Sequence, residues 1–552
     1  MKMITKVLLS FACLFGLISQ QQIKCQQAQI IEENMYKNLP FKMEQVQKPV
    51  IPSYQVNIKT FGAISDGVTS NTKAFEAAID TVFKKGGGTV IIPEGLWLTG
   101  PIKLKSNINL HAEKGALVLF TSDYDEYPVV KTWYEGLNCW RTMSPIYARD
   151  AENIAITGEG VFDGNGEAWR PVKKYLMTEY QWQKYLSRGG GLSDDKTIWY
   201  PTEGALKGSK STTPPGLRSE NESKEIKVFL RPVMVNLVNC KKVLLDGVTF
   251  QNSPAWCLHP LLSEDITVSN VKVENEEWTV NGDAIDLESC RNALIYNSVF
   301  DAGDDAICIK SGRDEEGRKR GVPTENVIVS NCMVYHGHGG FVVGSEMSGG
   351  VRNIKVMNCT FMGTDVGLRF KSTRGRGGIV ENIYISDINM INIDRDAILF
   401  DLYYAFFGKT TPENLPVAKA DETTPQFRNV YMKNIFCKGA KRAILFQGLP
   451  EMNLQNIYLE NSVIEAQTGV VCSEANQISM KNVQVYSTAQ PILDIHNATN
   501  IKIENFKCNE GPGTIFDISG SKTNNILFLN SVKDKQNLKI ENNVSKGAVK
   551  TE

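Results

Sequence analysis

The segment ENVIVSN at residues 325–331 returns as RNIKVMN at 352–358 and as ENIYISD at 381–387. Each copy places Ile or Val at alternate positions after an Asn and ends on Asn or Asp. A period of two is typical of a strand with one buried face. Asn and Asp are typical of turns. The repeat therefore predicts short strands separated by polar turns.

Further copies run through the chain at a nearly fixed spacing. With the second residue of each unit as an anchor, the anchors fall at 242, 265, 292, 326, 353, 382, 429, 456, 477, 500 and 525. Most intervals are 21–29 residues, and the two long ones contain insertions at 313–321 and about 405–426. Such a period indicates a solenoid. No Leu ladder or helical half is visible, so we predict an all-β, single-stranded parallel β-helix with Ile and Val stacked inside.

Two segments depart from this repeat. Residues 75–83 carry apolar side chains at helical spacing behind Asn71 or Thr72, either of which could be an N-cap. An open solenoid end needs a cover, so an N-terminal capping helix is expected. Residues 167–227 are rich in Trp, Tyr, Lys, Ser and Gly. We interpret them as a long loop insertion with some helix.

The N-terminus has the pattern of a secretory signal. Lys2 and Lys6 precede an apolar run at 7–18, which is too short to span a bilayer, and Ser19 is a small residue before the expected cut. We therefore predict a signal peptide at 1–19, a leader segment at 20–54 and one β-helix domain at 55–552. No later stretch is apolar enough for a membrane span, which predicts an exported protein, periplasmic or extracellular.

Charge and cysteine content exclude some partners. The 552 residues have a net charge of −1, so no binding of nucleic acid is expected. Separately, we expect a monomer. Among twelve cysteines, Cys240, Cys332 and Cys359 each follow an Asn of the repeat. This position favours small apolar core residues over a full disulfide framework, with one or two bridges left open.

Four polar motifs interrupt the repeat within about ninety residues. They are NGD at 281–283, GDD at 303–305, GHG at 337–339 and GLRFK at 367–371. Equal distances from successive anchors predict stacking at about 4.8 Å. By that rule Asp304, His338 and Asp365 form one column, and Asp283, Lys310 and Lys371 form a second. A mixture of acids, a His and cations predicts an acid/base site for an anionic polymer.

These motifs, in this order and spacing, resemble glycoside hydrolase family 28, the polygalacturonase family. The resemblance runs from about Val56 to the C-terminal coils. It implies a right-handed, pectin lyase-like parallel β-helix. It also implies inverting hydrolysis of α-1,4-galacturonan or a related pectic polysaccharide or oligogalacturonide.

The resemblance assigns roles by position. Asp304 resembles the general acid, Asp283 and Asp305 the pair that activates water, and His338 the residue that supports the protonated acid. The expected binders of the sugar carboxylate are Arg369 and Lys371. Further substrate-binding candidates are Lys310, Asn281 and Tyr404, with Tyr403 as the second choice for the tyrosine. Gly282 departs from the family, where many members have Thr.

The chemistry is consistent with these roles. Inversion needs a protonated carboxyl and a carboxylate on opposite sides of the sugar, usually about 6.5–9.5 Å apart. Clustered acids help to keep one proton bound, because like charges resist a second ionisation. We find no metal-binding motif near the site, so neither a metal nor a cofactor is expected.

Three alternatives stay open from the sequence. The substrate could be a rhamnogalacturonan or xylogalacturonan, the protein could be a pectate lyase, or it could be a non-catalytic carbohydrate-binding β-helix. A lyase would use a Ca²⁺ cluster with an Arg or Lys base, which GDD and GHG disfavour. If the insertions wall off one end of the cleft, only chain ends fit, which predicts exo-action on short oligosaccharides.

Overall fold

The computed structural model describes residues 32–406, 416–509, 513–532 and 534–552. The chain divides into two units, Met1–Gln45 and Val46–Glu552. In the first unit, the described residues begin with a short helix at 32–36. The predicted signal peptide lies outside the described residues. All of the strands discussed below belong to the second unit.

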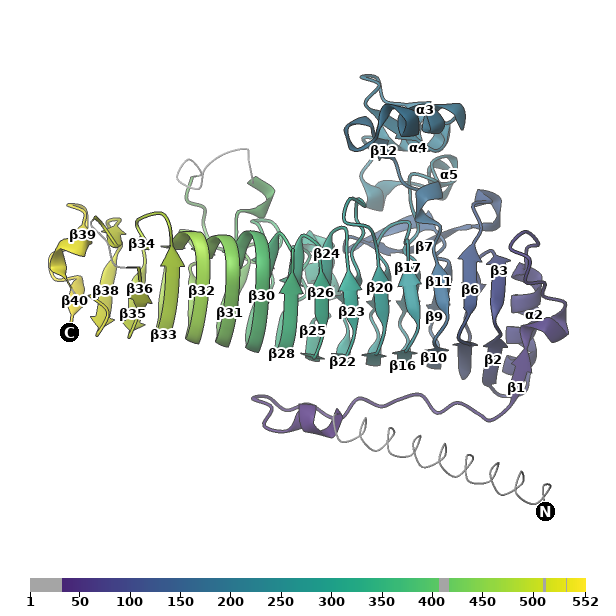
Figure 1. The fold of residues 1–552 in the computed structure, drawn as a ribbon, viewed down its shortest axis with the longest axis horizontal. Helices are drawn as coiled ribbons and strands as arrows, with labels where there is room; N and C mark the ends of the chain where they lie inside the picture. The colour runs from purple at the N-terminus through teal and green to yellow at the C-terminus, as the bar shows by residue number, and fades with distance from the viewer. Residues whose placement is uncertain (1–31, 407–415, 510–512, 533) are drawn as a thin grey trace, which may run out of the picture. The chain divides into compact units, whose positions relative to one another are not determined.

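The second unit is a right-handed parallel β-helix, as predicted (Figure 1). Its first sheet stacks β2 (Gly88–Ile92), β5 (Ile108–Ala112), β10 (Glu152–Gly158), β16 (Lys241–Asp246), β19 (Glu264–Ser269), β22 (Arg291–Tyr296), β25 (Thr324–Ser330), β28 (Val351–Met362), β30 (Ile379–Asp401), β31 (Gln426–Gln447), β32 (Leu454–Ser473), β33 (Ala475–Ser487), β35 (Thr499–Glu504), β38 (Asn524–Leu529) and β40 (Val549–Thr551). A second sheet stacks β3 (Gly95–Thr99), β6 (Ala116–Phe120), β11 (Val161–Asp163), β17 (Thr249–Gln251), β20 (Lys272–Glu274), β23 (Val299–Asp301) and β26 (Met333–Tyr335), and continues through the longer strands to β36 (Lys507–Cys508).

A third sheet, called the floor sheet below, carries the polar motifs. It stacks β4 (Ile102–Lys103), β9 (Ile146–Arg149), β15 (Val235–Val238), β18 (Leu258–Leu261), β21 (Ile285–Glu288), β24 (Asp305–Lys310), β27 (Gly339–Val343) and β29 (Val366–Lys371), and then continues through β30, β31, β32, β34 (Leu493–His496), β37 (Phe516–Ser519) and β39 (Leu538–Ile540). Side chains alternate between the core and the outside along each strand. Outward side chains of the floor sheet are therefore available to build a site.

The repeat explains both the core and the turns. Its Ile and Val positions register from coil to coil, as in Val243, Ile266, Ala293, Val327 and Ile354, all of which are buried. The anchor Asn residues adopt positive φ values, which Asn tolerates in turns. Their amides also form a ladder, in which Asn353 donates to Asn326 at 3.1 Å. The predicted polar turns are therefore present, and the anchor side chains also form a ladder along the stack.

The helix expected near residues 75–83 is α2 (Thr72–Lys84), which lies at the end of the stack formed by β1 (Gln55–Asn57) and β2 (Figure 1). Its buried residues, including Phe75, Ile79 and Val82, belong to the main core. Asn71 occupies the N-cap position, but its side chain accepts from the backbone N–H of Ile64 at 2.7 Å instead of capping the helix.

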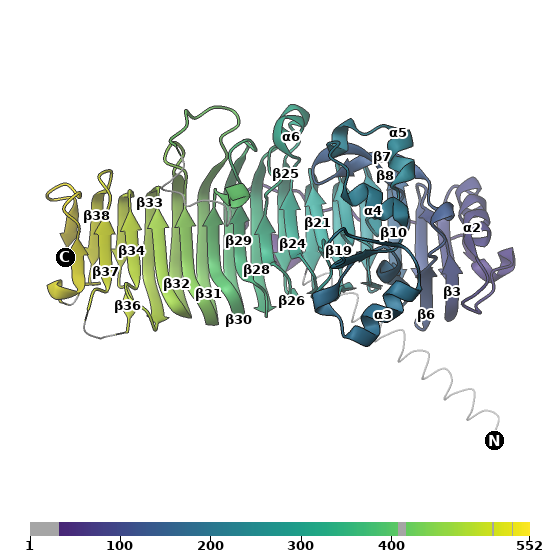
Figure 2. The same ribbon diagram turned by 90° about the horizontal axis from the view of Figure 1, so that it is seen from above.

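The insertion at 167–227 is a small folded element with its own core. It contains α3 (Glu179–Ser187), α4 (Glu203–Ser209), α5 (Glu220–Glu225) and an antiparallel sheet of β12 (Val172–Lys173), β14 (Ile198–Tyr200) and β13 (Gly191–Leu192). Trp182, Trp199 and Val172 pack together inside it. Figure 2 shows it over the part of the stack between β6 and β21. The insertion at 313–321 forms the helix α6 (Asp314–Arg320).

A hairpin that the sequence analysis missed covers part of the floor sheet. It consists of β7 (Val129–Tyr134) and β8 (Leu137–Thr142). The ring of Tyr134 packs on Trp256 at 4.5 Å between ring centroids. The Thr132 hydroxyl donates to Asn236 on β15 at 3.3 Å. This β7–β8 hairpin therefore closes over β15 and β18.

All ten cysteines in the described part of the chain are free thiols. Cys240, Cys332 and Cys359 belong to the core, as expected from their position in the repeat. Within the described residues, no helix is both long and apolar enough to cross a membrane.

Candidate active site

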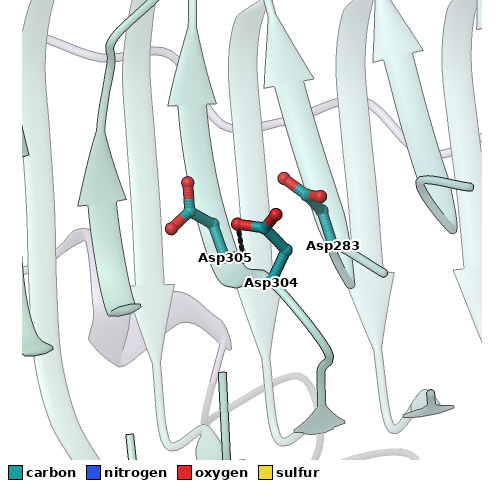
Figure 3. A group of neighbouring side chains, drawn as sticks. All are labelled: Asp283, Asp304 and Asp305. Carbon is teal, nitrogen blue, oxygen red and sulfur yellow. Dashed lines mark hydrogen bonds between the residues drawn. The ribbon is translucent and has the colours of Figure 1, made fainter. Parts of the chain in front are cut away.

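Three carboxylates meet on the outer face of the floor sheet (Figure 3). One oxygen from each of Asp283, Asp304 and Asp305 lies within 4.8 Å of the others. Asp304 and Asp305 are consecutive, and Asp304 Oδ1 accepts from the Asp305 backbone N–H at 3.0 Å. Asp305 is the first residue of β24 and Asp304 immediately precedes the strand, where the chain enters the floor sheet, and both side chains lie on the same side as Asp283 (Figure 3).

Glycines beside these acids are required by close packing. A Cβ at Gly303 would lie 2.1 Å from Thr279 Oγ1 and 2.5 Å from the Thr279 carbonyl oxygen. A Cβ at Gly282 would also lie 2.1 Å from that hydroxyl. Thr279 thus fills the space that a side chain at position 282 would take, and the turn at Gly303 brings Asp304 against Asp283.

The first predicted polar column is present. His338 Nδ1 lies 3.0 Å from Asp304 Oδ1, and His338 Nε2 lies 3.9 Å from Asp365 Oδ2. The His338 backbone N–H also donates to the Asp304 carbonyl at 2.8 Å. The hydrogen bond to Asp304 raises the pKa of His338, with smaller contributions from the negative charges of Asp304 and Asp365. His338 is therefore coupled directly to the proposed acid.

The second predicted column is wrong at one member. Ile285 is registered with Ile307, so Asp283 comes opposite Asp305, while Lys310 lies opposite Glu288. The cause is the loop of residues 275–282 between β20 and β21, which lengthens this coil and shifts the offset from its anchor. An equal distance from an anchor locates a residue only where neighbouring coils have equal loops.

Asp305 is buried between two cations. Arg369 Nη1 donates to Asp305 Oδ1 at 2.9 Å, and Lys371 Nζ donates to Asp305 Oδ2 at 2.7 Å. Burial opposes ionisation of Asp305, but the charges of Lys371, Arg369 and Lys310 outweigh it and hold its pKa far below the usual range. Asp305 is thus the ionised member of the acid cluster.

Asp283 has the opposite environment. It is buried, its Oδ1 has no hydrogen-bond partner within the described residues, and Lys310 Nζ lies 3.9 Å from its Oδ2. Burial first, and then the charges of Asp286 and Asp304, raise its pKa well above the usual value, against the opposing effect of Lys310. The cluster therefore places a carboxyl with a raised pKa next to an ionised carboxylate.

Lys310 is an internal ion partner in this structure. Its Nζ lies 3.3 Å from Asp286 Oδ1 and 3.3 Å from Glu346 Oε2, and its side chain is almost fully buried. The distance from Lys310 to Asp286 is short enough for an ion pair. Neither Asp286 oxygen has a hydrogen-bond partner in the described part of the chain, so this contact is not a hydrogen bond. Burial raises the pKa of Asp286 to about 7. The sequence analysis missed both Asp286 and Glu346, although the outward position of Asp286 on a strand follows from the repeat.

The remaining candidates differ in position. Tyr404 is 38% exposed, and its ring centroid lies 4.9 Å from Lys371 Nζ and 5.9 Å from Arg369 Cζ. Tyr403 is buried in the core. Asn281 accepts from Arg231 Nη2 at 2.8 Å through its side-chain oxygen, so that bond fixes the turn before Asp283. Tyr404 is therefore the tyrosine that reaches the site.

Oxygen ligands of the three aspartates would suit Ca²⁺ or Mg²⁺. However, both oxygens of Asp305 already accept from Arg369 and Lys371. Side-chain cations therefore supply the positive charge at this position. The arrangement offers one ionised carboxylate, one carboxyl with a raised pKa, and a third carboxyl bonded to a histidine.

Comparisons with known proteins address the same residues. The model of the glycosyl hydrolases family 28 matches residues 218–438, which contain all four motifs. A model described as rhamnogalacturonase A/epimerase, pectate lyase-like, matches residues 55–160. A probable polygalacturonase of Vitis vinifera is 26% identical over 68% of this chain and 66% of its own length. An exo-poly-alpha-D-galacturonosidase of Dickeya chrysanthemi is 28% identical over 67% of this chain and 61% of its own length. The chain thus spans slightly less than two thirds of these relatives.

Solved structures match over more of their length. The hyperthermoactive exopolygalacturonase of Thermotoga maritima is 36% identical, with a TM-score of 0.69 over 84% of this chain and 96% of that protein. The family 28 exopolygalacturonase of Yersinia enterocolitica shares the fold at 23% identity, with a TM-score of 0.65 over 84% of this chain and 79% of that protein. The four motifs, the matched family model and the relative at 36% identity show that this chain belongs to glycoside hydrolase family 28.

Proposed function

We propose that this protein is an exo-acting polygalacturonase, which hydrolyses galacturonosyl linkages at the ends of homogalacturonan chains. The observation that carries the proposal is the acid cluster of Asp283, Asp304 and Asp305 with Arg369 and Lys371 bound against it. A uronate polymer needs both an acid/base pair and fixed cations. The motifs, the family and the names of the similar proteins support the same activity.

The roles follow from the electrostatics of the site. Asp304 is the general acid that protonates the leaving oxygen, and His338 holds it in position through the 3.0 Å contact. Asp283 and Asp305 hold the attacking water between them. Asp305, being ionised, accepts the proton of that water, and Asp283 orients it by hydrogen bonding.

Inversion is part of the proposal, although the closest carboxylate oxygens lie within 4.8 Å, nearer than the usual spacing of about 6.5–9.5 Å. A retaining mechanism needs a free carboxylate nucleophile. Both Asp305 oxygens are engaged by cations, and the raised pKa of Asp283 favours its protonated form. Since neither is a good nucleophile, attack by water is favoured.

Arg369 and Lys371 have two roles in this proposal. In the free protein they bind Asp305, and a sugar carboxylate would compete for the same donors. Tyr404 lies over both cations and is exposed, so it offers an aromatic surface beside the expected carboxylate position. Binding of a uronate would therefore also weaken the hold on Asp305 and make it a stronger base.

Exo-action is supported by the β7–β8 hairpin. Outward side chains of β15 and β18, including Asn236, His259 and Leu261, are buried beneath it or its neighbours. A polymer cannot continue along the floor sheet on that side of the acids. Only a chain end fits, and the insertion at 167–227 lies over the same side (Figure 2).

The test is a product analysis with the purified protein. On homogalacturonan we expect galacturonate or a short oligomer from the first time points, with little early loss of viscosity, and no unsaturated product absorbing at 235 nm. A rapid viscosity drop would contradict exo-action. Product only from rhamnogalacturonan or xylogalacturonan would favour those substrates instead. Activity abolished by EDTA and restored by Ca²⁺ would favour a lyase.

We also propose that the protein is exported as a monomer, with residues 1–19 removed. N-terminal sequencing of the protein recovered outside the cytoplasm should begin just after Ser19. A protein that retains residues 1–19, or that remains in the cytoplasm, would contradict export.

A further inference from the structure

A cavity of about 380 Å³ lies between the β7–β8 hairpin, the insertion at 167–227 and the loop that leads to Asp283. Its lining includes Tyr134, Arg141, Arg218, Arg231 and Asn281. The volume is at the lower end of the range for small-ligand pockets. The mechanism above uses none of its arginines.

The cavity has an excess of positive charge. Within the described residues, Arg141 and Arg218 form no ion pair or hydrogen bond with an acceptor, although Arg141 is only 8% exposed. Arg231 is bonded to neutral oxygens only, those of Pro254, Val280 and Asn281. Arg141 and Arg231 are buried, whereas Arg218 is partly exposed at the same cavity. Buried cations are normally paired, so an uncompensated group of this kind favours an anion.

The acid that lines the cavity does not neutralise it. Glu135 is ion-paired with Arg313 of the α6 insertion, at 3.3 Å. Burial, together with the charges of Arg141 and Arg170, lowers the pKa of Arg231 to about 10 against the opposing effects of Tyr134 and Glu135. Burial and the charge of Arg141 also lower the pKa of Arg218 against the opposing effects of Cys139 and Glu222. A bound carboxylate would relieve the mutual repulsion among these guanidiniums.

The walls also suit a sugar. Trp140 lines the cavity, and the Arg141 guanidinium stacks on the ring of Tyr134 at 3.3 Å. The Tyr134 hydroxyl is buried and has no hydrogen-bond partner among the described residues. The unpartnered Tyr134 hydroxyl can bond to a sugar or carboxylate oxygen, and the ring of Trp140 can pack on a pyranose ring.

The cavity borders the turn that leads to the acid cluster, because Asn281 lines it. The Arg231 guanidinium donates to Asn281 at 2.8 Å, and Asn281 lies two residues before Asp283. A sugar in the cavity would therefore lie beside the turn that carries Asp283.

We propose that Arg141 and Arg218 bind the carboxylate of the terminal galacturonate and so select a uronic acid, not a neutral sugar, at the chain end. This inference rests on the proposed function, because it names the ligand of the closed side of the same site. The hairpin and the insertion then supply a specific end-binding site as well as a steric wall.

The test compares Arg218→Gln with the wild-type protein on trigalacturonate. Arg188→Gln is the matched control, because Arg188 belongs to the same insertion and is paired with Glu167 at 3.0 Å. Arg218→Gln should raise KM by about 10-fold or more with a smaller change in kcat, since a buried carboxylate loses one charged partner. Arg188→Gln should leave both constants unchanged.

A second measurement uses product inhibition. D-galacturonate should inhibit the wild-type protein far more strongly than D-galactose, and Arg218→Gln should reduce that difference by about 10-fold. Arg141→Gln should act in the same direction, with its melting temperature measured first because Arg141 packs on Tyr134. Equal inhibition by both sugars, or an unchanged KM in a folded Arg218→Gln variant, would overturn the inference. A wild-type protein that releases no galacturonate would instead refute the proposed function itself.

Discussion

The floor sheet has two halves that differ on either side of the three aspartates. The closed half consists of β15, β18 and β21, and the β7–β8 hairpin covers β15 and β18. The open half consists of β29 and the floor-sheet ends of β30 and β31. In the closed half, Leu261 and Glu288 are fully buried, whereas Asp401 and Gln447, which occupy the same register position in the open half, are partly exposed.

In the closed half, the polar side chains form hydrogen bonds with one another. Asn236 Nδ2 donates to His259 Nδ1 at 3.0 Å, so His259 presents the proton on Nε2 to Glu288, also at 3.0 Å. Arg320 from α6 donates to the other Glu288 oxygen at 2.6 Å. In the open half, Arg369 and Lys371 meet Asp305 and face the exposed ring of Tyr404. The comparison indicates that one half is a fixed wall and the other is a substrate surface.

The largest effect is expected at the boundary of the two halves. Asp304→Asn should lower kcat by about 10³-fold or more, because the leaving oxygen loses its proton donor. Binding of oligogalacturonide should be retained, since neither half is altered. Titration of the variant by calorimetry, beside reducing-sugar assays, measures both. Substantial residual activity would show that another group is the acid.

In the open half, Arg369→Ala should cost on the order of 2–5 kcal/mol in kcat/KM on free-acid oligogalacturonide. It should also abolish the preference for the free acid over the methyl ester. Arg428→Ala is the control, because Arg428 pairs with Glu381 on another face of the solenoid. Kinetics on matched free and esterified substrates across pH decide the role. A retained preference with a shifted pH profile would mean that Arg369 serves only to tune Asp305.

Sequence reasoning succeeded where the repeat is regular. The anchors located the strands, and the offsets brought Asp304, His338 and Asp365 into one column. It failed for Asp283, because the loop at 275–282 changes the length of that coil. It also missed the β7–β8 hairpin, whose strands pair antiparallel outside the repeat and are recognisable only through their contacts with Trp256 and Asn236. Local periodicity therefore predicts the stack, whereas the long-range packing that closes one half is not encoded in any spacing.

The closed half should depend on α6 for stability. Arg320→Met removes one partner of a fully buried carboxylate and should lower the free energy of unfolding by about 3 kcal/mol at pH 7. Burial would raise the pKa of Glu288, but His259 and Arg320 hold it down to about 2. The stabilisation that His259 and Arg320 provide by binding the ionised Glu288 is therefore full above the pKa of Glu in the unfolded chain, about 4.3, and is lost as the pH falls toward 2.

Urea unfolding at pH 7 and pH 3 measures this dependence, and the loss caused by Arg320→Met should be smaller at pH 3. Lys319→Met is the control on the same helix, since its pair with Glu315 is exposed and should change the free energy of unfolding much less. Equal losses for both variants would show that the Arg320–Glu288 contact does not stabilise the wall.

The smallest effect is a gain in stability at the inner edge of the closed half. Asp286 lies opposite Cys308 in the floor sheet, is fully buried, and has a pKa raised to about 7, first by burial and then by Asp305, against the attraction of Lys310. The unfolded pKa is about 3.9, so between pH 4 and 7 the folded protein binds a proton that the unfolded chain does not. Stability from this group therefore increases as the pH falls through that window, and the full cost of the charge is present above pH 7.

Asp286→Asn removes the charge and should stabilise the protein by about 2 kcal/mol at pH 8, less than the full electrostatic relief because the amide is still a buried polar group. Melting temperatures from pH 4 to 8 should show the difference from wild type shrinking toward pH 4, while Asp194→Asn, at an exposed position, should show none. A variant that is less stable than wild type at pH 8 would mean that the ion pair with Lys310 outweighs the burial of Asp286, and that the closed half is held together by its charges up to the catalytic cluster.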